Sequence, residues 1–169
     1  MKSLEPFDSE SGHVNVIIET PKGFRAKYAY DEEKQLFQLK SFLPAGMSFP
    51  FDFGFIPGTK GEDGDPLDIL VLLDEPAPQG SLVTTRLVAV IEAEQTKDAK
   101  TERNDRLIGI AAGTREYREV SSLDQLNPNL VEEIEHFFIS YNEMSGKVFK
   151  PIAREGAGHA RELIESARI

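Results

Sequence analysis

The sequence contains no cysteine, which excludes disulfide bonds, thiolate metal sites and a cysteine nucleophile. It also lacks a long hydrophobic run. The stretch Ile69 to Leu73 is five residues long and no aliphatic run exceeds it, whereas a membrane-spanning helix needs about 20 residues. Met1 to Asp8 holds two acids and a proline where a secretory signal needs an apolar segment. We therefore expect a cytoplasmic protein that does not associate with membranes.

Basic residues are in deficit. There are 19 Lys and Arg against 29 Asp and Glu, which gives a formal charge of −10. Such a surface repels nucleic acid and anionic membranes, so neither is an expected partner. A small anionic phosphate compound is still compatible with this charge where a metal ion or a local group of basic residues reverses its sign.

The length and composition predict one folded domain over residues 1–169, because 40% of the residues are hydrophobic and 28% are charged. Alternating apolar residues predict strands at 14–19, 26–30, 36–39, 67–73, 81–93 and 106–112. The proline- and glycine-rich stretch 44–64 is interpreted as loop with short extended pieces.

The last third of the chain has helical spacing. Asn127 followed by Pro128 is typical of a helix start, and the pattern predicts helices at about 128–144 and 157–167. Strands followed by helices favour a mainly β, α+β fold, with a β-barrel over about 14–115 and two flanking helices.

The most informative segment is Asp63-Gly64-Asp65-Pro66-Leu67-Asp68-Ile69. Three aspartates within six residues repel one another if they converge, and a hard divalent cation such as Mg²⁺ removes that repulsion. Asp68 interrupts an apolar strand, where a charge is costly unless it is paired or metal-bound. The alternatives are a solvated acidic turn and an EF-hand loop. The EF-hand fails on spacing, because Leu67 falls on a ligand position.

This segment resembles the aspartate signature of the soluble inorganic pyrophosphatases of the compact β-barrel type (family I). Three further segments are similar to that family in the same order: Ile18-Glu19-Thr20-Pro21-Lys22-Gly23 with Arg25-Ala26-Lys27-Tyr28, Phe53-Gly54-Phe55-Ile56-Pro57, and Phe137-Phe138 with Tyr141. Together they cover roughly residues 14 to 150.

The resemblance implies a closed five-stranded barrel of OB-like type with helices outside. It also implies hydrolysis of pyrophosphate to two phosphates with several Mg²⁺ ions, in a homo-oligomer. Carried over by position, the resemblance implies the following roles. Asp63, Asp65 and Asp68 bind metal, Asp65 also orients or deprotonates the attacking water, Glu19 lies in the outer metal shell, and Lys27 and Tyr141 bind phosphate oxygens.

Several positions depart from the family pattern. Ala29 stands where the family has a glutamate, and Ser41 where it has an arginine. Lys40 is adjacent to Ser41, but on a regular strand it would face the opposite side.

Three more departures remove polar groups. Phe49 and Phe53 replace tyrosines and have no hydroxyl to bind phosphate, and Asn142 replaces the lysine after the helix tyrosine.

The second metal-binding segment of the family is also altered. If Arg106 stands for the family's lysine and binds substrate, Asn104 occupies an aspartate position and Asp105 lies one residue off. Asp105 is nevertheless predicted as a metal ligand, and whether Asn104 or Asp105 faces the metals is left open. Glu94 is the candidate for the other aspartate.

These departures leave three interpretations. The first is a divergent Mg²⁺-dependent inorganic pyrophosphatase with a rebuilt phosphate pocket. The second is a hydrolase of another phosphate or phosphoanhydride compound on the same metal scaffold. The third is a non-catalytic metal-binding module. The sequence favours the first.

Overall fold

The computed structural model describes residues 4–169. The strands are β1 (Val14–Thr20), β2 (Ala26–Asp31), β3 (Leu36–Phe42), β4 (Asp52–Ile56), β5 (Leu67–Leu72), β6 (Leu82–Lys97), β7 (Lys100–Arg103), β8 (Arg106–Ala111) and β9 (Val148–Gly156). The helices are a 3-10 turn, η1 (Leu123–Gln125), and the α-helices α1 (Pro128–Met144) and α2 (Ala157–Ala167). Both α-helices cover the ranges that their sequence spacing predicts.

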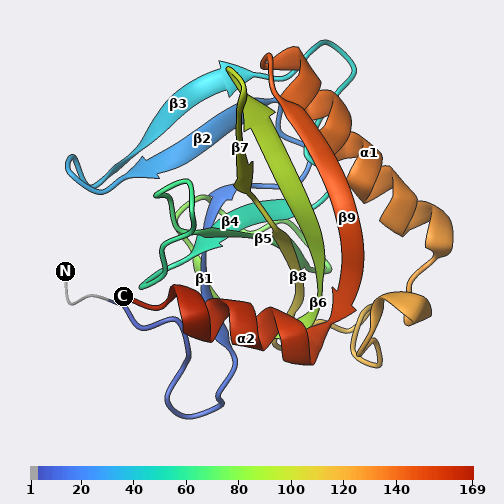
Figure 1. The fold of residues 1–169 in the computed structure, drawn as a ribbon. Helices are drawn as coiled ribbons and strands as arrows, with labels where there is room; N and C mark the ends of the chain where they lie inside the picture. Colours follow the sequence, from blue (N-terminus) through green and yellow to red (C-terminus); the bar gives the residue numbers. More distant parts are fainter. Residues whose placement is uncertain (1–3) are drawn as a thin grey trace.

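Five strands close into a ring in the order β1, β4, β5, β8, β6, with β6 pairing back to β1 (Figure 1). Only the β5–β8 pair of this ring is parallel. β2 and β3 form a separate two-stranded hairpin beside the ring. The predicted five-stranded, OB-like barrel with two flanking helices is confirmed.

The long strand β6 makes this closure possible. Its 16 residues pair with β1 and β8 at one end and with β7 at the other, while β9 runs along much of its length. The register against β8 shifts between Leu87 and Ala89, and such a bulge bends and twists a strand. The strand β6 can therefore take part in the five-stranded ring and also pair with β7 and β9 outside it.

Two glycines allow the strands to approach closely. A Cβ on Gly54 would lie 2.3 Å from the Ile17 carbonyl oxygen, and one on Gly109 would lie 2.4 Å from the Thr85 Cγ2. Only residues without a side chain fit at these two crossings of the barrel wall.

The barrel strands β4 and β8 are buried on both faces, as is the second part of β5. Leu70 and Leu72 of β5 pack with Ile134 and Phe138 of α1, whereas alternate β5 residues pack in the cluster that contains Ile164 of α2. α1 lies along β9 and α2 lies against β6 (Figure 1). Asp68 lies on the same β5 face as Leu70, so it lies at the edge of the cluster that α1 covers.

Helix α1 begins as its sequence predicts. The Asn127 side chain accepts a hydrogen bond from the Asn129 amide at 3.0 Å, and Pro128 occupies the first turn. Val131, Ile134, Phe137 and Phe138 form its buried face.

Two strands, β7 and β9, are not predicted from the sequence, whereas β4 is a short extended piece of the kind expected within 44–64. β7 is four residues long, and β9 carries Pro151. The register of β9 against β6 shifts next to Pro151, which accommodates a residue that cannot donate to a regular ladder. Within residues 4–169, no helix combines the length and hydropathy needed to cross a bilayer.

Candidate active site

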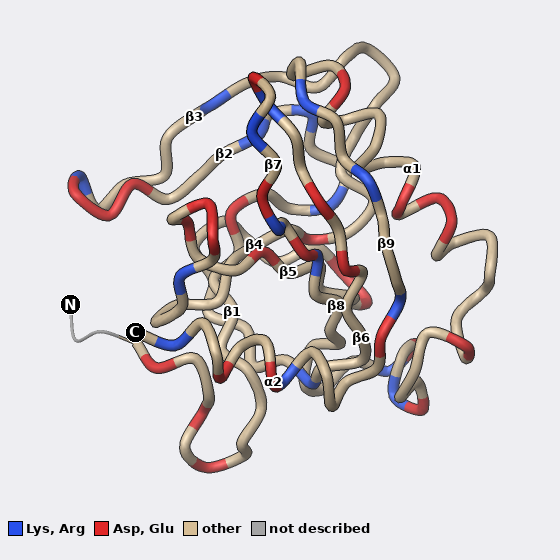
Figure 2. Tube along the Cα trace, viewed as in Figure 1, with Lys and Arg blue, Asp and Glu red and all other residues tan. Residues whose placement is uncertain are grey.

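A hollow of about 560 Å³ opens between the β2–β3 hairpin, the β4–β5 loop and the C-terminal end of α1. Acidic and basic residues both occur on the β2–β3 hairpin, as the colours of the trace in Figure 2 show. Polar side chains that line it include Glu19, Lys27, Lys40, Asp63, Asp65, Asp68, Gln95, Asn104, Arg106, Tyr141 and Lys147. The structure thus brings together the site residues expected from the sequence, except Asp105 and the candidate Glu94.

Glu19 is the buried carboxylate of the hollow, 7% exposed at the end of β1. Its Oε1 accepts a hydrogen bond from the Tyr30 amide at 2.7 Å. Burial raises the pKa of Glu19 to about 7, and the charges of Asp68 and Asp65 add to this effect. The aspartates therefore act on Glu19 electrostatically.

The loop before β5 presents Asp63 and Asp65 to the hollow. Asp63 Oδ1 accepts from the Asp65 amide at 3.1 Å, and the Gly61 amide donates to the Asp65 carbonyl at 2.8 Å. Gly64 has a φ of +88°, a conformation that L side chains rarely adopt, and this turns the chain between the two carboxylates. Desolvation raises the pKa of Asp63, and the charges of Asp65 and Asp68 raise it further.

Asp68 is held by Arg106. The Asp68 Oδ2 and Arg106 Nη1 are 2.7 Å apart, and Arg106 is only 4% exposed. The guanidinium lies 5.0 Å from the centre of the Phe138 ring and 5.3 Å from that of Phe149. Arg106 therefore lies in the hollow as expected, and it also fixes one of the predicted metal ligands.

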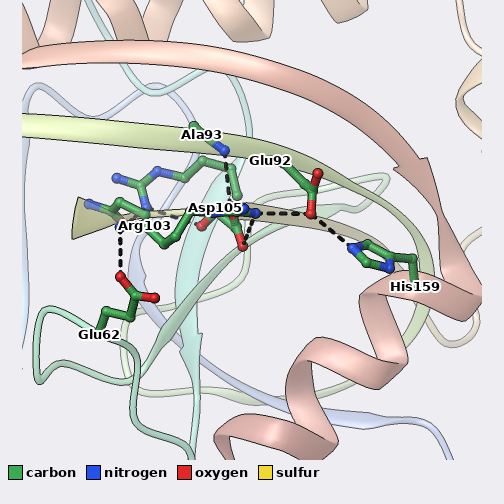
Figure 3. Close-up of polar contacts among 8 residues, drawn as sticks. Glu62, Glu92, Ala93, Arg103, Asp105 and His159 are labelled. Carbon is green, nitrogen blue, oxygen red and sulfur yellow. Dashed lines mark hydrogen bonds and ion pairs between the residues drawn. The ribbon is translucent and has the colours of Figure 1, made fainter. Parts of the chain in front are cut away.

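Asp105 points elsewhere. Its carboxylate accepts from Arg103 Nη2 at 2.9 Å and from the Ala93 amide at 2.9 Å, in a neighbouring hollow (Figure 3). Arg103 also binds Glu92, which bonds to His159 of α2 at 2.9 Å. The structure thus separates Asp105 from the other carboxylates, because successive residues of an extended segment alternate in direction.

Asn104 and Gln95 take the places where carboxylates are expected. Asn104 Nδ2 donates to Gln95 Oε1 at 2.9 Å, and the Asn104 Oδ1 accepts from Arg106. Glu94 is not among the residues that line the hollow, whereas Gln95 is. Adjacent side chains of a strand point to opposite faces, so Glu94 and Gln95 of β6 cannot both face the hollow. The alternation of apolar and polar residues along β6 could have indicated which of the two does.

Within residues 4–169, no three Asp, Glu or His side chains are close enough together to hold a metal ion as they stand. The carboxylates of Glu19, Asp63, Asp65 and Asp68 nevertheless share one hollow and carry only oxygen donors.

Lys27 and Tyr141 meet on the opposite side of the hollow. The Lys27 ammonium lies 5.0 Å from the centre of the Tyr141 ring, which stacks on Phe137 at 5.9 Å. Phe49 and Phe53 are almost completely buried, 1% and 4% exposed, and they pack against this aromatic group.

Lys40 also lines the hollow, so the expectation that it faces away is wrong. The β2–β3 register shifts between Lys27 and Tyr28, with Ser41 opposite Lys27 and Leu39 opposite Tyr28. Lys40 is the extra residue of this β-bulge, and a bulge breaks the alternation on which the expectation rested.

The structure is thus a closed β-barrel in which carboxylates and lysines line one open hollow, and such groups could hold a small anion together with cations. The family model described as inorganic pyrophosphatase matches residues 16–168. An inorganic pyrophosphatase of Methanosarcina acetivorans is 35% identical over 154 residues, which cover 91% of this chain and 89% of that protein. One of Thermus thermophilus is 34% identical over 170 residues, covering 99% and 94%.

Solved structures agree. The crystal structure of inorganic pyrophosphatase from Thermus thermophilus superposes with a TM-score of 0.88 at 32% identity, covering 98% of this chain and 95% of that one. That of an inorganic pyrophosphatase from Neisseria gonorrhoeae gives 0.87 at 29% identity, with coverages of 98% and 95%. The chain belongs to the inorganic pyrophosphatase family.

Proposed function

We propose that this protein hydrolyses inorganic pyrophosphate to two phosphates with the help of Mg²⁺. One observation carries the proposal. Asp63, Asp65 and Asp68 line one hollow together with Lys27 and Tyr141, in a chain that matches the family over nearly its whole length.

The residues of the hollow fit divalent cations. Asp63, Asp65, Asp68 and Glu19 offer only oxygen donors, which is the ligand type that Mg²⁺ prefers. Burial is the main cause of the raised pKa values of Glu19 and Asp63, and the charges of Asp65 and Asp68 add to it. A bound cation would favour the charged form of both carboxylates. When bound, the cations would supply Lewis acidity and lower the pKa of a coordinated water. The family depends on divalent metal ions, and Mg²⁺ is the ion that we propose here.

The side chains then have distinct roles. Asp65 orients the attacking water and accepts its proton as the oxygen attacks one phosphorus. The bond from that phosphorus to the bridging oxygen breaks, and the second phosphate leaves. Lys27 and Tyr141 bind phosphoryl oxygens and stabilise the charge that develops on them.

Arg106 binds the substrate in the same hollow, and it also holds Asp68 in place through their ion pair. Asp105 has no role in this scheme, because Arg103 and the Ala93 amide already bind its carboxylate.

We further propose that the chain acts as a single cytoplasmic domain and assembles as a homo-oligomer. Phe24 and Phe42 support self-association, because they are 49% and 66% exposed on the hairpin side of the molecule. Light scattering coupled to gel filtration tests this, since a monomer mass at micromolar concentration would contradict it.

The function is tested by phosphate release from pyrophosphate in Mg²⁺. Asp65→Asn keeps the size of the side chain but removes its charge and basicity, so we expect the rate to fall about 10²–10⁴-fold. Asp124→Asn is the matched control, because Asp124 lies exposed in η1 outside the hollow. Equal rates for wild type and Asp65→Asn would refute the proposed role.

A further inference from the structure

We propose that Lys40 is a substrate-binding residue that holds a phosphoryl group of pyrophosphate on the hairpin side of the hollow, and that Gln38 positions it. This inference rests on the proposed function and adds a residue pair to it.

The bulge in the hairpin determines where Lys40 points. Lys27 pairs with Ser41 and Ala29 pairs with Gln38, whereas Lys40 has no Cα partner of its own. In a β-bulge, two residues of one strand oppose a single residue of the other, so Lys40 and Ser41 both lie opposite Lys27. The lysine therefore reaches the face that carries Lys27 and Ala29, and all three line the hollow.

Gln38 fixes the end of the Lys40 side chain. The Lys40 ammonium donates to Gln38 Oε1 at 2.7 Å, which confirms that the two side chains share a face. Gln38 is neutral, and Ala29 opposite it brings no charge. Among the ion pairs formed within residues 4–169, none involves Lys40, and its charge is felt by the nearby Asp31, which already binds Lys34.

Lys40 thus lines the hollow without forming an ion pair of its own, although Asp31, Glu32 and Glu33 of the same hairpin line it as well. Lys27 lies on the same face, and two like charges on neighbouring strands disfavour each other unless an anion lies between them. Pyrophosphate carries several negative charges on two phosphoryl groups, so a second ammonium can bind one group while the aspartate side engages the other. Lys40 and Lys27 would together offer two ammonium groups to such a substrate from the hairpin.

The inference is tested by calorimetric binding of Mg²⁺ with imidodiphosphate, a pyrophosphate analogue whose bridging oxygen is replaced by NH. Lys40→Met removes the charge but keeps the chain length, and we expect about tenfold weaker binding. Lys40→Arg should restore most of the affinity. Gln38→Leu should weaken binding about threefold and raise KM rather than lower kcat. Lys150→Met is the control, because Lys150 is exposed on β9 outside the hollow.

The outcomes separate this inference from the function on which it rests. Wild-type affinity in Lys40→Met would overturn the inference, even if pyrophosphate is hydrolysed. If the wild type binds the analogue through Lys40 but releases no phosphate from pyrophosphate, the binding role stands and the proposed hydrolysis fails. If the wild type does not bind the analogue, the binding role of Lys40 is refuted, whereas the proposed hydrolysis is decided by phosphate release from pyrophosphate alone.

Discussion

At the scale of single residues, Arg106 links the stability of the fold to the geometry of the site. Its guanidinium is buried between Phe138 and Phe149 and pairs with Asp68. Arg106→Met keeps much of the packing but leaves Asp68 without its partner. Since Asp68 is 26% exposed, water offsets part of the loss. We expect the free energy of unfolding in urea to fall by about 1–3 kcal/mol.

Adding Mg²⁺ distinguishes this account of Arg106 from a packing defect alone. A cation at Asp68 would replace the lost positive charge, so saturating Mg²⁺ should restore part of the stability of Arg106→Met. An unchanged deficit in Mg²⁺ would contradict the pairing role of Arg106.

Asn104 carries a second prediction at this scale. Its amide oxygen accepts from Arg106 and its amide nitrogen donates to Gln95. Asn104→Asp keeps the acceptor for Arg106 and adds a carboxylate to the wall that carries Asp68. We expect several-fold tighter apparent binding of Mg²⁺, measured as the metal dependence of phosphate release. Asp105→Asn, in the neighbouring hollow, should leave that metal dependence unchanged.

At the scale of elements, the barrel depends on close contacts between its strands. A Cβ on Gly54 would lie 2.3 Å from the Ile17 carbonyl oxygen in the β1–β4 pair. We expect Gly54→Ala to lower the free energy of unfolding by about 1–3 kcal/mol or more, as overpacking does. Gly158→Ala in α2 is the control, because nothing lies within 4 Å of its Cβ position and alanine favours a helix. Equal stability of the two variants would contradict this view of the barrel.

The sequence predicts the elements unevenly. Helix α1 is predictable because its cap and its apolar spacing agree, and the aspartate segment is predictable because Asp68 breaks an apolar strand. β4 is predictable only as a short extended piece without bounds, since Gly54 and the neighbouring prolines are typical of loops although the strand is buried throughout. β9 is not predicted because it contains Pro151, and proline is uncommon within a strand.

The site residues are also predicted only in part from the sequence. Asp63, Asp65, Asp68, Lys27 and Tyr141 converge in the hollow as expected. The orientation of Lys40 depends on a β-bulge, and that of Asp105 depends on which residues of its extended segment face the hollow. A single sequence reveals neither.

At the scale of the whole molecule, α2 is tied to the barrel by an interaction that depends on pH. The hydrogen bond to Glu92 raises the pKa of His159 above its usual 6.5, and the charges of Glu92, Glu155 and Glu162 add to this. Stability from this pair is complete below pH 6.5 and is lost as the pH rises through the folded-state pKa. The pKa of Glu92 is lowered by His159 and Arg103, so its contribution is lost only as the pH falls below the usual 4.5.

We therefore expect unfolding in urea to be easier at about pH 8 than at about pH 6, and His159→Gln to reduce that difference. Glu19, whose pKa is raised to about 7, adds its own decline over the same range in both proteins. The difference between wild type and variant thus isolates His159. The same pH dependence in both would contradict the tie between α2 and β6.

The proposed function depends on which phosphate compound the hollow hydrolyses. The most direct measurement is kcat/KM for phosphate release in Mg²⁺, compared among pyrophosphate, tripolyphosphate and ATP. We expect pyrophosphate to be cleaved far faster than the other two, because the proposed roles assign its two phosphoryl groups to the aspartates and lysines that line one hollow. Absence of release from pyrophosphate, or faster release from ATP or tripolyphosphate, would contradict the proposed function.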